Sequence, residues 1–247
     1  WDIVVGTLPD GYTATATFTG AQVVPGSCEN SMAITVWDAA GRAANNNFDI
    51  SYIFGKLQVT KRPITVTSYG ATKVYDGEPL RYESYTLDGE LLSEHFLDVS
   101  FPEGITNVGS VTNNIVVRVQ NLYGDGSIGG DATDFYEITV RVGTLKVTPR
   151  PIEVSATPCI KYFSGDEPPE GKYFLTKGSL VPGHELYAEV EAVINYENTV
   201  EYMLRNVGVY ESWGKSADVT RAGAAGAVSV TSNYEITLVH GIDRDML

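Results

Sequence analysis

The chain has 247 residues, of which 43% are hydrophobic and 19% charged, which is the composition of a folded protein rather than of a disordered one. Its formal net charge of −14 argues against nucleic acid and anionic membrane surfaces as partners, because phosphates attract clusters of Lys and Arg. The sequence contains no run of about 18 apolar residues, so we expect no membrane insertion within it.

Short strands are predicted along the whole chain. Residues 8–18 (LPDGYTATATF) and 48–60 (FDISYIFGKLQVT) alternate apolar with polar residues, which is typical of half-buried strands. The same alternation follows at 64–68 (ITVTS), 115–119 (IVVRV) and 136–148 (YEITVRVGTLKVT), with Gly and Asp clustered between the segments. No window shows helical periodicity with caps. We therefore predict an all-β protein with about six or seven short strands per roughly 90 residues.

The strand pattern repeats along the chain. Residues 48–64 (FDISYIFGKLQVTKRPI) recur as 136–152 (YEITVRVGTLKVTPRPI), and NVGSV at 107–111 recurs as NVGVY at 206–210. Several matched anchors at a fixed period predict a tandem array. We place its repeats in three ranges, which are an incomplete first repeat at 1–61, a complete second repeat at 62–149, and a third repeat with an atypical last strand at 150–247.

Each repeat is predicted to be a small β-sandwich of the immunoglobulin-like, Greek-key type. Tyr136 and Tyr234 open their strands directly after a polar turn, as does the tyrosine of a tyrosine corner, whose hydroxyl bonds to backbone. An ordinary half-buried strand tyrosine is the alternative. Phe48 holds the same place in the first repeat and has no hydroxyl. Proline marks each joint and favours extended backbone before it, so we expect the repeats to lie end to end as a semi-rigid rod.

The first repeat lacks the counterpart of residues 63–83. In the second repeat this stretch supplies a strand whose alternation places Ile64 and Val66 toward the core. We expect the first repeat to be the weakest part of the chain, dependent on the second repeat or on a strand from another molecule. The chain begins at Trp1 without a charged-then-apolar leader, so we expect it to be part of a longer protein whose secretion signal or wall anchor lies elsewhere.

The sequence offers few residues for catalysis. His95 and His184 occupy equivalent places, and one histidine per repeat is not a zinc constellation, so we predict turn histidines. Phosphate-binding, nucleophile-elbow and zinc-protease motifs do not occur, and repeats of this size rarely form a cleft for paired carboxylates. We therefore predict neither an enzyme nor a cofactor. Cys28 and Cys159 fall in different repeats, which favours free thiols over a disulfide.

One acidic loop is a weak calcium candidate. Residues 121–134 (NLYGDGSIGGDATD) carry three aspartates and one asparagine, and Ca²⁺ binds six to eight oxygens on flexible loops. The equivalent loops keep one acid (DAAGRAANNN) or none (TRAGAAGAVSVTSN), so we predict a solvated turn and no metal, with calcium as the alternative. The candidate ligands would be Asn121, Asp125, Asp131 and Asp134.

Four stretches carry a family resemblance. They are GKLQVTKRPITVTSYGATKVYDGEPL (55–80), NVGSVTNNI (107–115), GTLKVTPRPIEVSA (143–156) and NYEIT (233–237). They resemble the MBG-type repeats, often marked by a YDG motif, of bacterial cell-surface adhesin-like proteins. The third repeat departs from the pattern, with KYFSGDEPP in place of KVYDGEPL.

The resemblance implies an extracellular protein, secreted or displayed at the bacterial cell surface or cell wall. On that basis we expect a structural stalk or spacer that presents a distal binding region away from the envelope, with adjacent repeats of the same protein as its partners. The alternative is that the repeats themselves bind a host or environmental glycan, mucin or protein.

Overall fold

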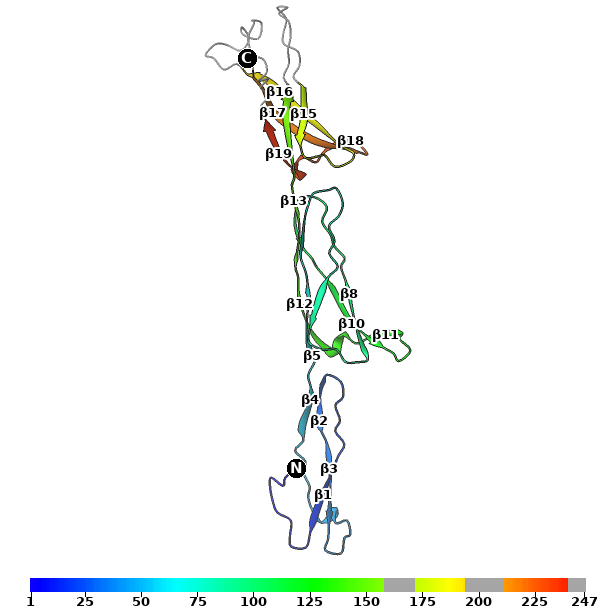
Figure 1. The fold of residues 1–247 in the computed structure, drawn as a ribbon. Coiled ribbons are helices and arrows are strands. Elements are labelled where there is room, and N and C mark those ends of the chain that lie inside the picture. Colours follow the sequence, from blue (N-terminus) through cyan, green and yellow to red (C-terminus); the bar gives the residue numbers. More distant parts are fainter. Residues whose placement is uncertain (158–171, 194–210, 240–247) are drawn as a thin grey trace, which may run out of the picture. The chain divides into compact units, whose positions relative to one another are not determined.

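The computed structural model describes residues 1–157, 172–193 and 211–239. Over these residues the chain forms β-strands and three short 3-10 turns, without an α-helix (Figure 1). The predicted all-β class is confirmed, since the strands assemble into several small sheets. The described residues include no helix long and apolar enough to cross a membrane.

The contacts within the chain define two compact units. The first unit comprises Trp1–Val66, Thr86–Val99 and Val117–Arg141. Its sheets are β1-β3, β2-β4, β12-β5-β7 and β11-β10-β8. The strands that lie wholly or mainly in this unit are β1 (Thr13–Phe18), β2 (Gly26–Asn30), β3 (Met32–Trp37), β4 (Gly55–Val59), β5 (Arg62–Ser68), β7 (Tyr85–Asp88), β8 (His95–Ser100), β10 (Val116–Leu122), β11 (Ile128–Asp131) and β12 (Tyr136–Arg141).

The second unit comprises Thr67–Tyr85, Ser100–Val116 and Val142–Leu247. Its described strands form the sheets β6-β13-β9, β15-β14-β19 and β16-β17-β18. They are β6 (Ala71–Val74), β9 (Gly109–Thr112), β13 (Thr144–Thr148), β14 (Arg150–Thr157), β15 (Lys172–Lys177), β16 (His184–Val193), β17 (Glu211–Gly223), β18 (Gly226–Ser229) and β19 (Tyr234–Val239).

The number of strands differs from the prediction. Residues 62–149 form nine strands, β5 to β13, instead of six or seven. The additional strands escaped prediction because β6, β7, β9 and β11 have only four residues each. Four residues hold two cycles of alternation, which is too short to stand out from a turn.

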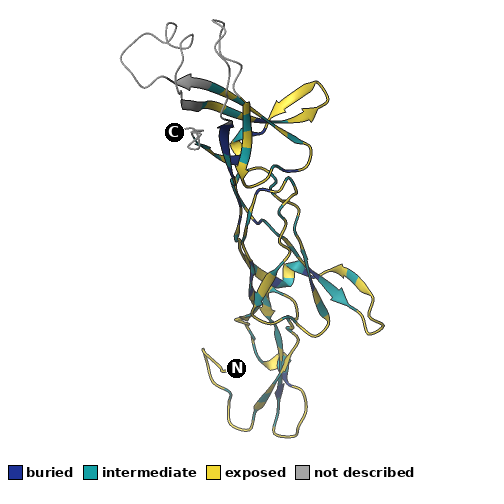
Figure 2. Ribbon diagram, turned by 45° about the horizontal axis from the view of Figure 1, so that its top comes forward, coloured by how far each residue is buried: buried dark blue, intermediate teal, exposed yellow. Residues whose placement is uncertain are grey.

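The central strand of each three-stranded sheet carries much of the buried apolar surface. Strand β14 pairs antiparallel with β15 and parallel with β19, with Ile152 opposite Ile236. Strand β5 is likewise the central strand of its sheet, between β7 and β12. Ile64 and Val66 are 2% and 0% exposed, which confirms that this strand faces the core as predicted (Figure 2). Two buried aliphatic side chains contribute about 1.5–3 kcal/mol each to folding.

Very short connections join successive strands at the two proline-marked places. Pro149 alone separates β13 from β14. Thr60 and Lys61 separate β4 from β5. Because proline fixes φ and restricts the residue before it, these joints allow few backbone conformations.

Candidate functional site

In the described part of the chain, an edge-on pair of aromatic rings recurs three times in the same local setting. The first ring of each pair follows a turn closed by a hydrogen bond from its own amide to the carbonyl oxygen three residues earlier. The second ring follows a 3-10 turn. The three pairs, with the distances between ring centroids, are Tyr12 and Phe48 at 5.3 Å, His95 and Tyr136 at 5.5 Å, and His184 and Tyr234 at 5.8 Å.

The 3-10 turns before these second rings are anchored alike. They are η1 (Asn45–Asn47), η2 (Thr133–Phe135) and η3 (Thr231–Asn233). In each, the residue before the turn donates its amide to the carbonyl oxygen of a buried valine at 2.8 Å, and the first side chain of the turn accepts that valine's amide. The three valines are Val36, Val119 and Val219, each at most 2% exposed.

The hydroxyl of Tyr234 links two backbone segments. It accepts the amide of Val181 at 3.0 Å and lies 2.7 Å from Nδ1 of His184. The hydroxyl can donate its proton to Nδ1 of a neutral imidazole protonated on Nε2, or accept the proton that Nδ1 carries in the other tautomer. The same contacts occur around Tyr136, where the partners are the amide of Leu92 at 3.0 Å and Nδ1 of His95 at 2.7 Å.

This arrangement differs in one respect from a tyrosine corner, one of the two alternatives that the sequence left open. Both hydroxyls bond to backbone, as in a tyrosine corner. Their partners lie 44 and 53 residues earlier in the chain, whereas a tyrosine corner bonds a few residues upstream. The histidines predicted to be turn residues are the second partners of these hydroxyls.

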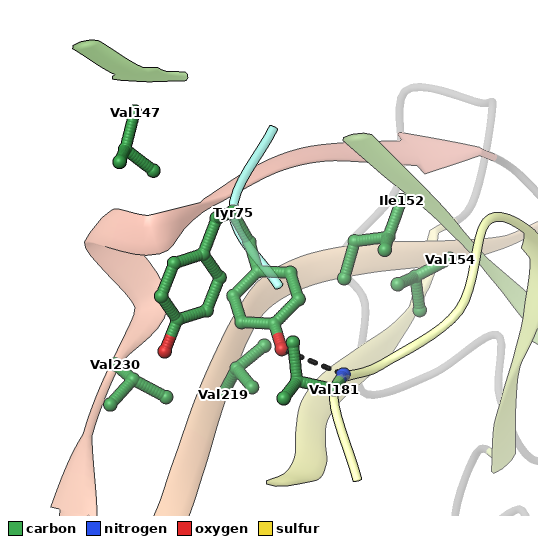
Figure 3. Packing of buried hydrophobic residues seen from close by; sticks show 8 residues of the cluster. Tyr75, Val147, Ile152, Val154, Val181, Val219 and Val230 are labelled. Atoms are coloured by element: carbon green, nitrogen blue, oxygen red, sulfur yellow. Dashed lines mark hydrogen bonds between the residues drawn. The ribbon is translucent and has the colours of Figure 1, made fainter. Parts of the chain in front are cut away.

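Tyr75, the first residue of the YDG motif, packs against the last of these pairs. Its side chain is only 2% exposed, and its ring centroid lies 5.8 Å from that of Tyr234 and 6.1 Å from that of His184. Figure 3 shows the surrounding side chains and the hydrogen bond to the amide of Val181. The buried members of the cluster are Tyr75, Val147, Ile152, Val154, Val181, Val219, Val230 and Tyr234.

Backbone contacts hold Tyr75 in this cluster. Its amide donates to the carbonyl oxygen of Thr148 at 2.9 Å, directly after the parallel pairing of β6 with β13. Its carbonyl oxygen accepts from the guanidinium of Arg150 at 3.4 Å. The same guanidinium donates to the carbonyl and hydroxyl oxygens of Ser179. Arg150 therefore joins the YDG segment to the turn before β16.

The other two residues of the motif shape the turn after Tyr75. Oδ1 of Asp76 lies 2.6 Å from Nζ of Lys73 and accepts the amide of Glu78 at 3.0 Å, and these bonds hold the pKa of the Asp76 carboxyl below its usual value. Gly77 has φ +85°, and a Cβ there would lie 2.8 Å from Cγ1 of Val181, so only glycine fits. The side chain of Lys73 is 22% exposed.

The NVG segment makes a second contact in the same region. The amide of Val108 donates to Oδ1 of Asn233 at 2.8 Å, and Nδ2 of Asn233 donates to Oδ1 of Asn107 at 3.1 Å. Asn233 is 3% exposed and stands directly before Tyr234. The YDG and NVG motifs thus meet the two adjacent residues that end η3 and begin β19.

Burial shifts the pKa values of His184 and Tyr234. The pKa of His184 is lowered from its ordinary value, mainly by burial and secondarily by Arg221, which lies opposite it in the pairing of β16 with β17. The pKa of the Tyr234 hydroxyl is raised by burial. Both shifts favour the neutral forms of the two side chains.

In the acidic loop, the carboxylates of Asp125 and Asp131 accept hydrogen bonds from residues of the same loop. Asp125 accepts the amide and hydroxyl of Ser127, and these bonds lower the pKa of the Asp125 carboxyl. The Asp131 carboxyl accepts the amide of Thr133, and its bonds to Thr133 lower its pKa. Asp134 is fully exposed and lies 3.7 Å from Lys61. Asn121 lies on β10.

Within the described ranges, the structure brings together no group of three or more His, Cys, Asp or Glu side chains that could hold a metal ion. Cys28 is a free thiol that donates to the carbonyl oxygen of Ala21 at 3.4 Å. Cys159, for which we also predict a free thiol, lies outside the described residues, as does the predicted last strand of the third repeat.

Comparisons of this chain with protein-family models, with curated proteins and with solved structures found no match. The contacts around Tyr75 and Tyr234 are therefore the structural basis for the proposed function. Sequence reasoning missed this site, although both motifs were visible, because nothing in a YDG or NVG triplet tells which distant residue it contacts.

Proposed function

We propose that this chain is a structural stalk or spacer segment of a bacterial cell-surface adhesin-like protein. Its units are small immunoglobulin-like β-sandwich repeats of the MBG type, and they present a distal binding region away from the cell envelope. The observation that carries the proposal is the burial of Tyr75, from the second repeat, against His184 and Tyr234, from the third.

A spacer needs joints that resist bending, and the contacts of Tyr75 supply the physical reason for such a joint. A buried aromatic side chain moves out of its cluster only at the cost of exposing apolar surface, which is worth about 25 cal/mol per Å². The two hydrogen bonds of Asn233 and the single residue Pro149 between β13 and β14 add further restraint. Together they limit the conformations available where the second repeat meets the third.

A spacer of this kind is also built by repetition. The threefold recurrence of the ring pair, the 3-10 turn and the buried valine supports a tandem array. The formal net charge of −14 supports display at high local density, since like charges keep neighbouring chains apart.

Small-angle scattering tests this function. A compact globule of 247 residues has a radius of gyration of about 18 Å. We expect a clearly larger value and an extended distance distribution, whereas a value near 18 Å would contradict the spacer. Tyr75→Ala should broaden the distribution by loosening the joint, and Tyr69→Ala, at a 45% exposed residue, is the matched control.

A second candidate function is binding by the repeats themselves. Among the described residues six tyrosines are at least 39% exposed, and aromatic residues are enriched at recognition surfaces. They are Tyr52, Tyr69, Tyr82, Tyr85, Tyr123 and Tyr187. A screen of this chain against glycans, mucins and host proteins distinguishes the two functions, because a spacer gives no saturable binding that is lost on changing these tyrosines to Ala.

A further inference from the structure

An apolar groove of about 710 Å³ lies in the first 55 residues. One wall is residues 1–8 and the other is residues 48–53 with Gly55. Its floor comes from strands β1 to β3, through Ala14, Phe18, Asn30, Met32, Ile34 and Val36. The volume is within the range of pockets that enclose a ligand.

The two walls match two strands that flank a central strand elsewhere in the chain. Residues 48–53 (FDISYI) correspond to the start of β12 (YEITVR) and β19 (YEITLV). Residues before the Gly-x-Leu triplet at 6–8 correspond to β7 and β15, which precede the same triplet at 89–91 and 178–180. In those sheets, β5 and β14 lie between the flanking strands.

The space around the glycine of each triplet differs according to whether a central strand lies beside it. All three have positive φ, +82° at Gly6, +99° at Gly89 and +78° at Gly178. A Cβ on Gly89 would lie 2.9 Å from the carbonyl oxygen of Pro63 in β5, and one on Gly178 would meet that of Pro151 in β14 even more closely. A Cβ on Gly6 would meet nothing within 4 Å. The position of a central strand is therefore open beside Gly6.

The two walls have the exposure expected of strands without a partner. Neither residues 1–5 nor residues 49–54 form a strand. Val5 and Ile53 are 88% and 77% exposed, although the segments that correspond to these walls elsewhere in the chain form the strands β7, β15, β12 and β19. Unpaired backbone and exposed apolar side chains on both sides of one groove make a surface that an added strand would cover.

We propose that this groove binds an extended β-strand carrying the pattern Arg-Pro-Ile-x-Val, as a central strand between residues 1–5 and 49–54. The two central strands of this chain define the occupant. Both have the pattern, with Ile64 and Val66 in β5 and Ile152 and Val154 in β14, and all four side chains are at most 3% exposed. By the pairing of β14, the added strand runs parallel to residues 49–54 and antiparallel to residues 1–5.

The buried positions set the specificity of the groove. The residue between Ile and Val is Thr65 in β5 and Glu153 in β14, so this position of the strand accepts side chains of different size and charge. Ile and Val supply the apolar surface, and the peptide backbone supplies hydrogen bonds to both walls. A peptide of suitable pattern is therefore sufficient for binding.

The test uses the whole chain and a labelled peptide with the sequence of residues 61–70 (KRPITVTSYG). The control peptide carries Asp in place of its Ile and its Val. We expect saturable binding of the first peptide, with the control at least about tenfold weaker, because each buried aliphatic side chain is worth more than one factor of ten. Binding should also slow hydrogen exchange in residues 1–5 and 49–54. Equal binding of both peptides, or no slowing of exchange there, would overturn the proposal.

Two glycine variants localise the binding. Gly6→Ala places a Cβ where the incoming proline carbonyl would lie, so it should weaken peptide binding at least about tenfold. Gly41→Ala is the control, since Gly41 has φ +74° and open space but is not in the groove. Equal effects of both variants would contradict the proposal. Self-association that the peptide reverses would support it with a second copy as strand donor, whereas self-association without peptide binding would refute it.

Discussion

The amide nitrogen of Val181 lies 3.0 Å from the hydroxyl oxygen of Tyr234. At the equivalent positions in the first 48 residues, neither the donor nor the acceptor of this hydrogen bond is present. There the equivalent residues are Pro9, which has no amide hydrogen, and Phe48, which has no hydroxyl. The ring contact remains, since Phe48 still meets Tyr12 edge-on at 5.3 Å. A buried donor without an acceptor is costly, so losing both together avoids the cost of losing one.

Tyr234→Phe should therefore destabilise the chain, because it leaves the amide of Val181 without its partner. The expected loss is about 1–3 kcal/mol. Val181→Pro removes that amide, so the double variant should lose less than the sum of the two single losses. Urea unfolding of the three variants gives the coupling energy. Additive losses would show that the bond contributes nothing of its own.

The same double-mutant cycle can be made as a control for the equivalent hydrogen bond between Leu92 and Tyr136. Tyr136 and Leu92 make the equivalent bond at 3.0 Å, so Tyr136→Phe and Leu92→Pro should couple with the same sign. A cycle that couples at one site and not at the other would mean that local packing, rather than the shared hydrogen bond, sets the energy.

Tyr75→Ala should be among the most destabilising substitutions in the described chain. It removes a 2% exposed ring from the cluster and leaves a cavity beside Val181 and Tyr234. Loss of a large buried aromatic side chain costs about 3–5 kcal/mol. Tyr69→Ala changes an exposed tyrosine in the same unit and should stay within about 0.5 kcal/mol. Thermal or urea unfolding compares the two, and similar losses would mean that Tyr75 does not anchor the cluster.

Acidification should weaken the second unit through His184. The folded-state pKa of His184 lies below its ordinary value of 6.5, so the unfolded chain binds the proton more readily. The stability due to the neutral ring is thus fully present above pH 6.5 and is lost as the pH falls from 6.5 toward the folded-state pKa. Urea midpoints measured from pH 7.5 to pH 5 should fall across this window.

His184→Gln separates this histidine from the carboxylates. Glutamine keeps an acceptor for the Tyr234 hydroxyl but does not titrate. The variant should therefore show a smaller loss of stability between pH 7.5 and pH 5 than the parent chain. An unchanged pH dependence would assign the effect to other groups.

Removal of divalent metal should leave the unfolding midpoint unchanged. The carboxylates of Asp125 and Asp131 accept hydrogen bonds from Ser127 and Thr133 in their own loop. A bound metal would raise stability by RT ln(1 + [L]/Kd). Thermal scans with EDTA and then with excess Ca²⁺ test this, and a midpoint that drops with EDTA and returns with Ca²⁺ would restore the calcium hypothesis.

The sequence by itself determined the all-β class and the direction of the core-facing side chains in β5. Both depend on period-2 alternation, which any strand expresses within its own few residues. Ile64 and Val66 are buried as that rule predicts. The recurrence of whole motifs also located the equivalent positions of Phe48, Tyr136 and Tyr234, at which the structure places the same ring contact three times.

Only the tertiary structure decided which distant residues these motifs contact. Val108 and Asn233 are 125 residues apart, and Val181 and Tyr234 are 53 apart. Alternation predicts the face of the strand on which a side chain lies. It does not predict which residues pack against that face, because those residues come from other parts of the chain. For the same reason the open space beside Gly6 became visible only once β1 to β3 had placed the floor of the groove.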